Sequence, residues 1–258
     1  MWYIILNRRG VDKLQNVFKG DREMKKLMET AKKVPKWGWW FGFGYFALQY
    51  GMYRLGDFLS MVIGTKDFAH AVKIAAIDDL IPVIPVFALI YLFSYIFWIC
   101  GPISVSLTGK RNFVNYLSGL TLAYFIGFLI FTFYPTYMDR AAEGLMDYSG
   151  GGGFFDGLLA IIYAADGSEL AFNLFPSYHC LISVYCYLGV RKREEVSKGF
   201  RVYTLVMTIL ICLSTVFTKQ HYIIDTFGGL AISILCYMLM QRLDPGKRWI
   251  EKHEKQEV

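Results

Sequence analysis

The sequence is poor in charge. Asp, Glu, Lys and Arg make up 19% of its 258 residues, whereas hydrophobic residues make up 55% and aromatic residues 17%. A soluble domain usually has about 25% charged residues. The low charge excludes an ordinary soluble domain and indicates an integral membrane protein. The net charge of +6 would suggest nucleic acid as the partner of a soluble protein, but in a membrane protein its distribution matters more, and no nucleic acid is expected.

Residues that bind metals or form disulfides are also scarce. No two of the five cysteines form a CxxC pair, and the four histidines include no HExxH motif. We therefore expect no metal and no cofactor. All five cysteines lie within or beside apolar runs, as small buried hydrophobic residues do: Cys100, Cys180, Cys186, Cys212 and Cys236.

No cleavable signal peptide is expected either, because Met1 to Leu6 is too short an apolar stretch, and the first membrane helix is expected to act as the insertion signal. A membrane helix needs roughly 20 mostly apolar residues. Six stretches come near that length, and they predict an all-α fold, a six-transmembrane helical bundle. The expected spans, of which the last three are short, are Trp37–Leu59, Leu80–Cys100, Val114–Phe133, Ser177–Val190, Tyr203–Phe217 and Asp225–Met240.

The bundle is expected to form one catalytic domain over residues 37–243, between two charged ends. In residues 1–36 the spacing of apolar positions fits a basic amphipathic helix lying on the membrane surface, and an ordinary solvated helix remains the alternative. Residues 244–258 are expected to form a charged cytoplasmic tail. Oligomeric state is left open by the sequence.

Basic residues are distributed unevenly between the two sides of this layout. Residues 1–36, the connections at 110–111 and 191–202, and the C-terminal tail hold 22 of the 27 Lys and Arg residues. Because cytoplasmic connections are rich in Lys and Arg, both termini are predicted to be cytoplasmic in a multi-pass protein of the cell membrane. The opposite side then carries the connection 134–176, with one basic and six acidic residues.

A run of four glycines, Gly150 to Gly153, lies inside this connection. A glycine loop that cradles phosphate needs a strand before it and a helix after it, and the sequence does not predict them here. A mobile lid or a plain flexible linker is therefore expected.

Two motifs at the ends of apolar runs carry the chemistry. In Pro176-Ser177-Tyr178-His179, Ser177 is a good N-cap, and His179 falls in the first helical turn. The start of a helix binds phosphate-like anions through free backbone N–H groups and its dipole. We expect Ser177 and Tyr178 to contact phosphate there, and His179 to donate a proton to a leaving oxygen.

The second motif places Asp225 four residues after His221, a spacing that puts both on one face of a helix. Asp225 would fix the tautomer of His221, which becomes a nucleophile or a base. Lys219 and Arg140 are the cations expected to bind phosphate. Each residue alone has a simpler role, as a cap or an interfacial residue. Their concurrence on one side of the membrane favours a catalytic site.

The first motif resembles the P-S-G-H motif of the type 2 phosphatidic acid phosphatase superfamily. Residues Ser214 to Asp225 resemble its S-R-x5-H-x3-D motif, with Ser214, His221 and Asp225 in register. The six-span layout, over about residues 37–240, is similar as well. The resemblance implies that His221 forms a phosphohistidine while Asp225 orients it. It also implies that His179 protonates the leaving lipid alkoxide and that Ser177 is a phosphate ligand.

The chain departs from the family pattern at three places. Tyr178 replaces the glycine of P-S-G-H, and Thr215 replaces the arginine after the serine, so that Lys219 would have to supply the missing charge. The K-x6-R-P motif keeps only Arg140, with Phe133 at the lysine position and Ala141 at the proline position. Relaxed motifs of this kind are similar to those of the inositol phosphorylceramide synthase-like branch.

The sequence thus predicts a membrane enzyme that cleaves a phosphate ester or anhydride of a lipid at the extracytoplasmic face. Phosphatase activity is the first expectation, and transfer of a phospho-headgroup to diacylglycerol or ceramide is the alternative. A non-enzymatic lipid or anion transporter is disfavoured, because the polar residues lie at the ends of the spans and no internal repeat is evident.

Overall fold

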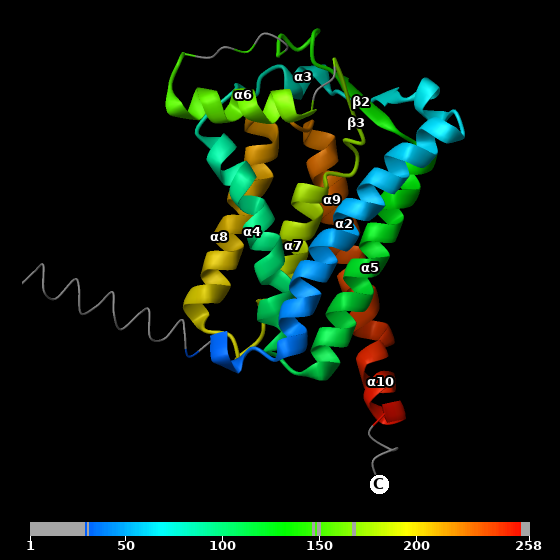
Figure 1. The fold of residues 1–258 in the computed structure, drawn as a ribbon, viewed down its shortest axis with the longest axis vertical. Coiled ribbons are helices and arrows are strands. Elements are labelled where there is room, and N and C mark those ends of the chain that lie inside the picture. Colours follow the sequence, from blue (N-terminus) through cyan, green and yellow to red (C-terminus); the bar gives the residue numbers. More distant parts are fainter. Residues whose placement is uncertain (1–28, 30, 146–147, 149–150, 167–168, 254–258) are drawn as a thin grey trace, which may run out of the picture.

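A computed structural model describes residues 29, 31–145, 148, 151–166 and 169–253. The amphipathic segment predicted over residues 1–36 lies largely outside the described residues. Among the described residues, six helices form an elongated bundle (Figure 1): α2 (Lys36–Val62), α4 (Phe87–Ser106), α5 (Lys110–Phe133), α7 (Tyr178–Val190), α8 (Lys198–Phe217) and α9 (Ile223–Leu243).

Each predicted span corresponds to one of these helices, and the fold is mainly helical as expected. Four of the helices, α4, α5, α8 and α9, are long and apolar enough to cross a membrane. α2 is long but more polar, with Arg54 and Asp57 near its end, and α7 has only 13 residues.

The predicted start of the second span was wrong by about two turns. α4 begins at Phe87 rather than Leu80. Pro82 and Pro85 explain the difference, because proline disfavours helical backbone at the residue before it and cannot donate a helical hydrogen bond. The helix then continues through Pro102 and ends at Ser106, beyond the predicted end.

The connection 134–176 is more ordered than a loop. It contains strand β2 (Thr136–Asp139), helix α6 (Phe154–Asp166) and strand β3 (Leu170–Phe172). β2 pairs in parallel with β1 (His70–Ala71) and antiparallel with β3, in the order β1-β2-β3. Figure 1 shows α6 lying across the end of the bundle, beside α3 (Ala75–Asp78). The short helix η1 (Thr65–Phe68) joins α2 to β1.

The glycine run leads directly into α6. Gly152 has a φ of 75°, and the N–H of Gly153 donates to Oδ2 of Asp156 over 3.1 Å. The hydroxyl of Tyr148 donates to the other oxygen of Asp156, and this hydrogen bond holds the pKa of Asp156 below its usual value. The described part of the run is therefore fastened to the first turn of α6.

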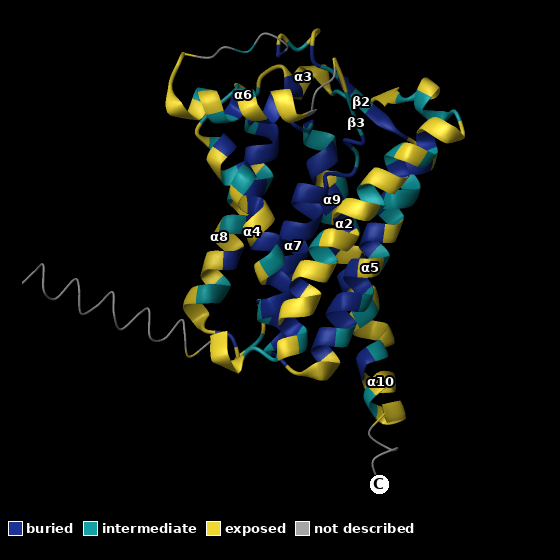
Figure 2. Cartoon of the chain, viewed as in Figure 1, coloured by how far each residue is buried: buried dark blue, intermediate teal, exposed yellow. Residues whose placement is uncertain are grey.

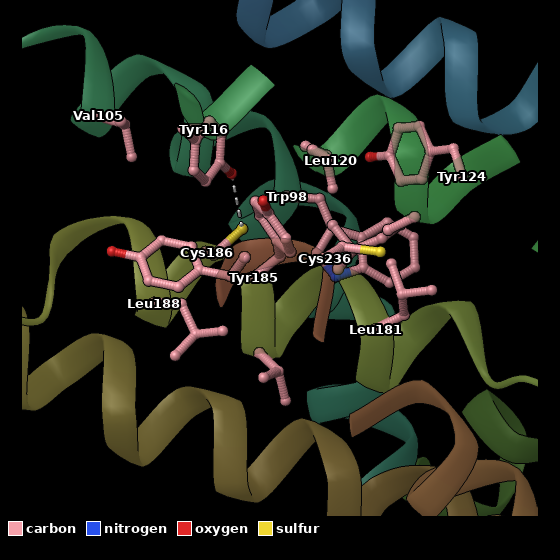
Figure 3. Close-up of a cluster of buried hydrophobic side chains, with 14 of the residues drawn as sticks. Trp98, Val105, Tyr116, Leu120, Tyr124, Leu181, Tyr185, Cys186, Leu188 and Cys236 are labelled. Carbon is pink, nitrogen blue, oxygen red and sulfur yellow. Dashed lines mark hydrogen bonds between the residues drawn. The ribbon is translucent and has the colours of Figure 1, made fainter. Parts of the chain in front are cut away.

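α7 is the central helix of the bundle. It packs against α4, α8 and α9, and almost all of its residues are buried (Figure 2). Figure 3 shows the core around it, where Tyr185 and Leu181 of α7 meet Tyr116 and Leu120 of α5. Of the five cysteines, three are buried and all are unpaired. A helix buried on all sides positions its first turn rigidly.

At the other end of the bundle, α10 (Pro245–His253) follows α9 and packs against α5. Asn115 of α5 accepts from the N–H of Gly246 over 2.7 Å and donates to Oδ1 of Asp244 over 2.9 Å. Arg111 forms an ion pair with Asp244. This segment begins the predicted charged tail.

Candidate active site

Ser177 caps α7 as predicted. Its Oγ accepts a hydrogen bond from the N–H of Cys180 over 3.4 Å, and its own N–H donates to the carbonyl of Asp225 over 3.0 Å. The approach to the cap is fixed by Thr136 of β2, whose hydroxyl accepts from the N–H groups of Leu174 and Phe175. Ser177 is fully buried, and it joins the start of α7 to the start of α9.

His179 lies in the first turn of α7, inside a wall of aromatic rings from α4. Its imidazole stacks on Tyr91 at 4.1 Å between ring centroids and meets Trp98 and Tyr95 edge-on at 4.7 and 5.6 Å. The residue is 8% exposed, and its Nε2 has no hydrogen-bond partner in the described part of the chain. The aromatic wall fixes the ring and leaves one nitrogen available.

His221 lies in the turn between α8 and α9. The expectation that it shares a helix face with Asp225 was therefore wrong, although the two side chains do meet: Nδ1 of His221 is 3.5 Å from Oδ2 of Asp225. Asp225 belongs to the first turn of α9, where Oδ2 accepts the N–H of Tyr222 over 2.8 Å. Because Nδ1 faces this carboxylate, Nε2 is the nitrogen left for chemistry.

The two imidazoles converge. Their ring centroids are 6.0 Å apart, although 42 positions separate His179 from His221 in the sequence. The expectation that both motifs meet at one end of the bundle is confirmed by this distance. A group the size of a phosphate bound between them would contact both rings.

The two expected cations behave differently. Arg140 is 2% exposed and lies under α6, where it donates to Oε1 of Gln220 and to the carbonyl of Tyr163, each over 3.4 Å. It therefore reaches the residue next to His221. Lys219 has a φ of 48°, and its Nζ donates to the carbonyl of Asp78 over 2.6 Å. Lys219 is thus engaged with α3.

The side chain of Tyr178 lies away from the histidines. Its hydroxyl donates to the carbonyl of Tyr124 over 2.7 Å, and its ring packs against Phe131 at 4.8 Å between centroids. Consecutive helix residues point about 100° apart because a turn holds 3.6 residues. Tyr178 consequently faces α5 while His179 faces α4, so the Tyr178 side chain is directed away from the space between the two histidines.

Thr215, at the position of the family arginine, is fully buried in a small polar cluster. Its hydroxyl lies 3.3 Å from Oγ1 of Thr226 and 3.6 Å from Sγ of Cys180. Its carbonyl accepts the N–H groups of both Gln220 and His221. Thr215 therefore shapes the turn that carries His221 and adds no charge there.

Asp78, which the sequence did not single out, positions the turn from the opposite side. This buried carboxylate accepts the N–H of Ile223 over 2.9 Å through Oδ1 and the N–H of Ile74 over 2.7 Å through Oδ2. It stabilises the start of α9 together with Asp225, which accepts the N–H of Tyr222. No sequence spacing indicates a contact across 145 residues.

A second brace links the same turn to the connection 134–176. The hydroxyl of Tyr222 donates to Oε1 of Glu143 over 3.0 Å, and burial raises the pKa of this phenol, which keeps it protonated. Glu143 also pairs with Lys73 at 2.7 Å. Hydrogen bonds from Lys73 to Asp79 and Glu143 raise the pKa of Lys73.

Comparison with known proteins identifies the family of this chain. Residues 70–239 match the model of the PAP2 superfamily. Over 109 residues, which are 41% of this chain, the sequence is 25% identical to the inositol phosphorylceramide synthase catalytic subunit aur1 of Schizosaccharomyces pombe. The match spans only 25% of that protein's length. No solved structure matches the chain.

The family match covers more than half of the chain and includes every helix end that carries a site residue. His179 and His221 face each other inside it, in the two motifs that resemble those of the family. The chain therefore belongs to the PAP2 superfamily of membrane lipid phosphatases and phosphotransferases.

Proposed function

We propose that this protein removes a phosphoryl group from a lipid phosphate through a phosphohistidine formed on His221. The observation that carries the proposal is the 6.0 Å separation of two imidazoles, one braced by Asp225 and the other by aromatic rings. Two imidazoles at this distance suit a nucleophile and a general acid acting on one phosphorus atom.

In the first step, Nε2 of His221 attacks phosphorus while the bond from phosphorus to the lipid oxygen breaks. The protonated His179 donates its Nε2 proton to that oxygen, so the lipid leaves as an alcohol. Asp225 stabilises the positive charge on His221 through the 3.5 Å contact with Nδ1. The hydroxyl of Ser177 accepts from the N–H of Cys180, which leaves its own hydrogen for a phosphate oxygen.

In the second step, water attacks the phosphohistidine. His179, now neutral, takes a proton from the water as the bond from phosphorus to His221 breaks. Inorganic phosphate leaves, and both histidines return to their starting protonation states. The start of α7 offers backbone N–H groups and the positive end of the helix dipole to the anion in both steps.

The membrane arrangement is part of the proposal. All six bundle helices would cross the bilayer with both termini cytoplasmic, because Lys and Arg gather at the end opposite the histidines. With 13 residues, α7 is about 20 Å long, less than the roughly 30 Å hydrocarbon core. Its first turn would therefore lie below the extracytoplasmic surface, where lipid headgroups can reach it.

Transfer of the phospho-headgroup to a lipid alcohol is the second candidate function. It is favoured by the similarity to aur1, whose name describes an inositol phosphorylceramide synthase. The chemistry of the first step is unchanged. In the second step the hydroxyl of a lipid such as diacylglycerol or ceramide would replace water.

The test uses purified full-length protein in detergent micelles with a panel of lipid phosphates, with and without diacylglycerol or ceramide. His221→Ala is expected to abolish turnover and His179→Ala to lower it by about 10²- to 10⁴-fold, the range for losing a general acid. Free phosphate as product identifies the phosphatase, and a new phospholipid identifies the transferase.

His70→Ala is the matched control. His70 is an exposed histidine near the same end of the bundle, and its ring stacks on Tyr134 at 4.0 Å between centroids. This variant should retain wild-type turnover. Trapping radiolabelled phosphate on the wild-type protein but not on His221→Ala identifies the intermediate. Full activity of His221→Ala would contradict the mechanism.

A further inference from the structure

Gln220 presents a buried amide whose donor is unused. The residue is 7% exposed, and its Oε1 accepts a hydrogen bond from Nη2 of Arg140 over 3.4 Å. A guanidinium has donors and no acceptor, so the oxygen of the amide must face Arg140. The amide nitrogen therefore points elsewhere, and Nε2 has no partner in the described part of the chain.

The backbone holds this amide in a fixed relation to His221. The N–H groups of Gln220 and His221 both donate to the carbonyl of Thr215, over 3.0 and 3.1 Å. Lys219, just before them, adopts a left-handed conformation that reverses the chain after α8. Gln220 is thus held as firmly as the histidine that follows it.

Other unpartnered atoms belong to the same site. Among the described residues, Nε2 of His179 and Oδ1 of Asp225 are buried without a hydrogen-bond partner, and Nδ1 of His221 has only its 3.5 Å contact with Asp225. Buried polar groups are normally satisfied, and leaving several unsatisfied in one place is costly. A ligand that supplies oxygen atoms would satisfy the two donors, Gln220 and His179, together.

In the described part of the chain, two expected sources of positive charge do not serve this site. Thr215 occupies the position of the family arginine and is enclosed by Thr226 and Cys180. Lys219 donates to the carbonyl of Asp78. Donors to a bound phosphate must therefore come from other residues, and Gln220 is adjacent to the nucleophile.

The contact with Arg140 alone does not explain why the side chain at position 220 is an amide rather than a carboxylate. A carboxylate at position 220 would bind the guanidinium more strongly than a neutral amide oxygen does. An amide offers a donor as well as an acceptor, and the donor is the atom that remains free.

The geometry points to Gln220 as a phosphate ligand: Nε2 donates to a non-bridging oxygen of the phosphoryl group held between His179 and His221, and Arg140 orients the amide. The assignment rests on the proposed function. It adds a neutral donor that stabilises charge as the phosphoryl group is transferred, in the manner of an oxyanion hole.

The test compares Gln220→Met, which removes the donor at similar volume, with Gln220→Glu, which keeps an acceptor for Arg140 and places a negative charge toward the phosphate. We expect kcat/KM to fall about 10²- to 10³-fold in Gln220→Met, the loss seen when one such donor is removed, and at least as far in Gln220→Glu. Orthovanadate, a phosphate analogue, should inhibit both variants at least ten times more weakly than the wild type.

Gln49→Met is the matched control, because Gln49 is equally buried but lies midway along α2. It should retain turnover and vanadate inhibition. Thermal unfolding in detergent identifies a variant that fails to fold, and Gln220→Glu keeps the contact with Arg140 that supports folding. Wild-type vanadate inhibition in a folded Gln220 variant overturns the assignment. If His221→Ala is inactive in that experiment, the proposed function survives; if it is active, the function itself fails.

Discussion

The two ends of the bundle differ in how completely their buried polar groups are hydrogen-bonded. At the basic end, Asn115 both accepts from Gly246 and donates to Asp244, and Arg193 donates to Asn112. At the histidine end, polar side chains are equally buried, but several of their atoms lack partners in the described part of the chain: His179, Gln220, His221 and Asp225.

This difference separates polar groups that hold the fold together from donors, Nε2 of His179 and Nε2 of Gln220, that are available to a ligand. The basic end joins α5, α9 and α10, so satisfied hydrogen bonds there stabilise the fold. At the histidine end the backbone is held firmly while side-chain atoms stay free. Substitutions should therefore lower stability at the basic end and turnover at the histidine end.

Among the substitutions that test this contrast, the largest effect is expected for Asp225→Asn. An amide can still accept the N–H of Tyr222, so the start of α9 should remain intact. Because the amide is neutral, it cannot stabilise a positively charged His221 as the carboxylate does. We expect kcat to fall by about 10³- to 10⁴-fold, as for an aspartate that orients a catalytic histidine, and this is measured with the preferred lipid phosphate.

Thermal unfolding of Asp225→Asn should lie close to that of the wild type. A variant that unfolds at much lower temperature, with activity lost in proportion, would place Asp225 among the structural groups and weaken the contrast between the two ends.

A smaller effect on turnover is expected for Asp78→Ala. Asp78 touches no reacting atom in the proposed mechanism but positions the turn through Ile223. Misplacing His221 by a fraction of an ångström should lower kcat by about 10- to 100-fold. Asp78→Asn keeps one acceptor and should recover part of the loss, whereas a purely structural role would lower stability in both variants without restoring kcat.

The sequence predicts the parts of this site that lie within one motif. The Ser177 cap, the first-turn position of His179 and the approach of Asp225 to His221 all follow from residues a few positions apart. Apolar runs of span length likewise predict the bundle helices, and the prolines before Phe87 account for the shift in α4.

The sequence does not predict contacts that depend on tertiary structure. The hydrogen bond between Asp78 and Ile223 joins residues that are 145 positions apart in the sequence. The hydrogen bond between Arg140 and Gln220 joins residues that are 80 positions apart. Lys219 was expected at the phosphate because it is two residues from His221, but the left-handed turn directs it to α3. α6 was missed because 13 residues are too few for a span and its apolar face is recognisable only against the bundle.

At the basic end, Asn115→Ala should lower stability with little change in turnover. The substitution leaves the N–H of Gly246, a buried residue, without its acceptor and removes a donor to Asp244. We expect a loss of about 1 to 3 kcal/mol in the free energy of unfolding, the cost of leaving a buried group unsatisfied. Denaturant unfolding in mixed micelles measures it, and kcat/KM in the folded fraction should match the wild type.

The smallest effect concerns pH. Hydrogen bonds from Arg111 and Asn115 hold the pKa of Asp244 well below its usual value of about 3.9. A depressed pKa in the folded state means that the stabilisation is complete above the usual pKa and is lost as pH falls below it.

Asp244→Asn has no such carboxylate. The stability difference between wild type and Asp244→Asn should therefore be constant from pH 7 to about pH 5 and shrink below about pH 4. Because Arg111 is largely exposed, solvent and salt screen the ion pair, and added salt should reduce the difference at neutral pH. A difference that grows on acidification would mean that the pKa of Asp244 is raised in the folded protein. Its carboxylate would then be poorly stabilised at neutral pH, and the contrast with the histidine end would fail.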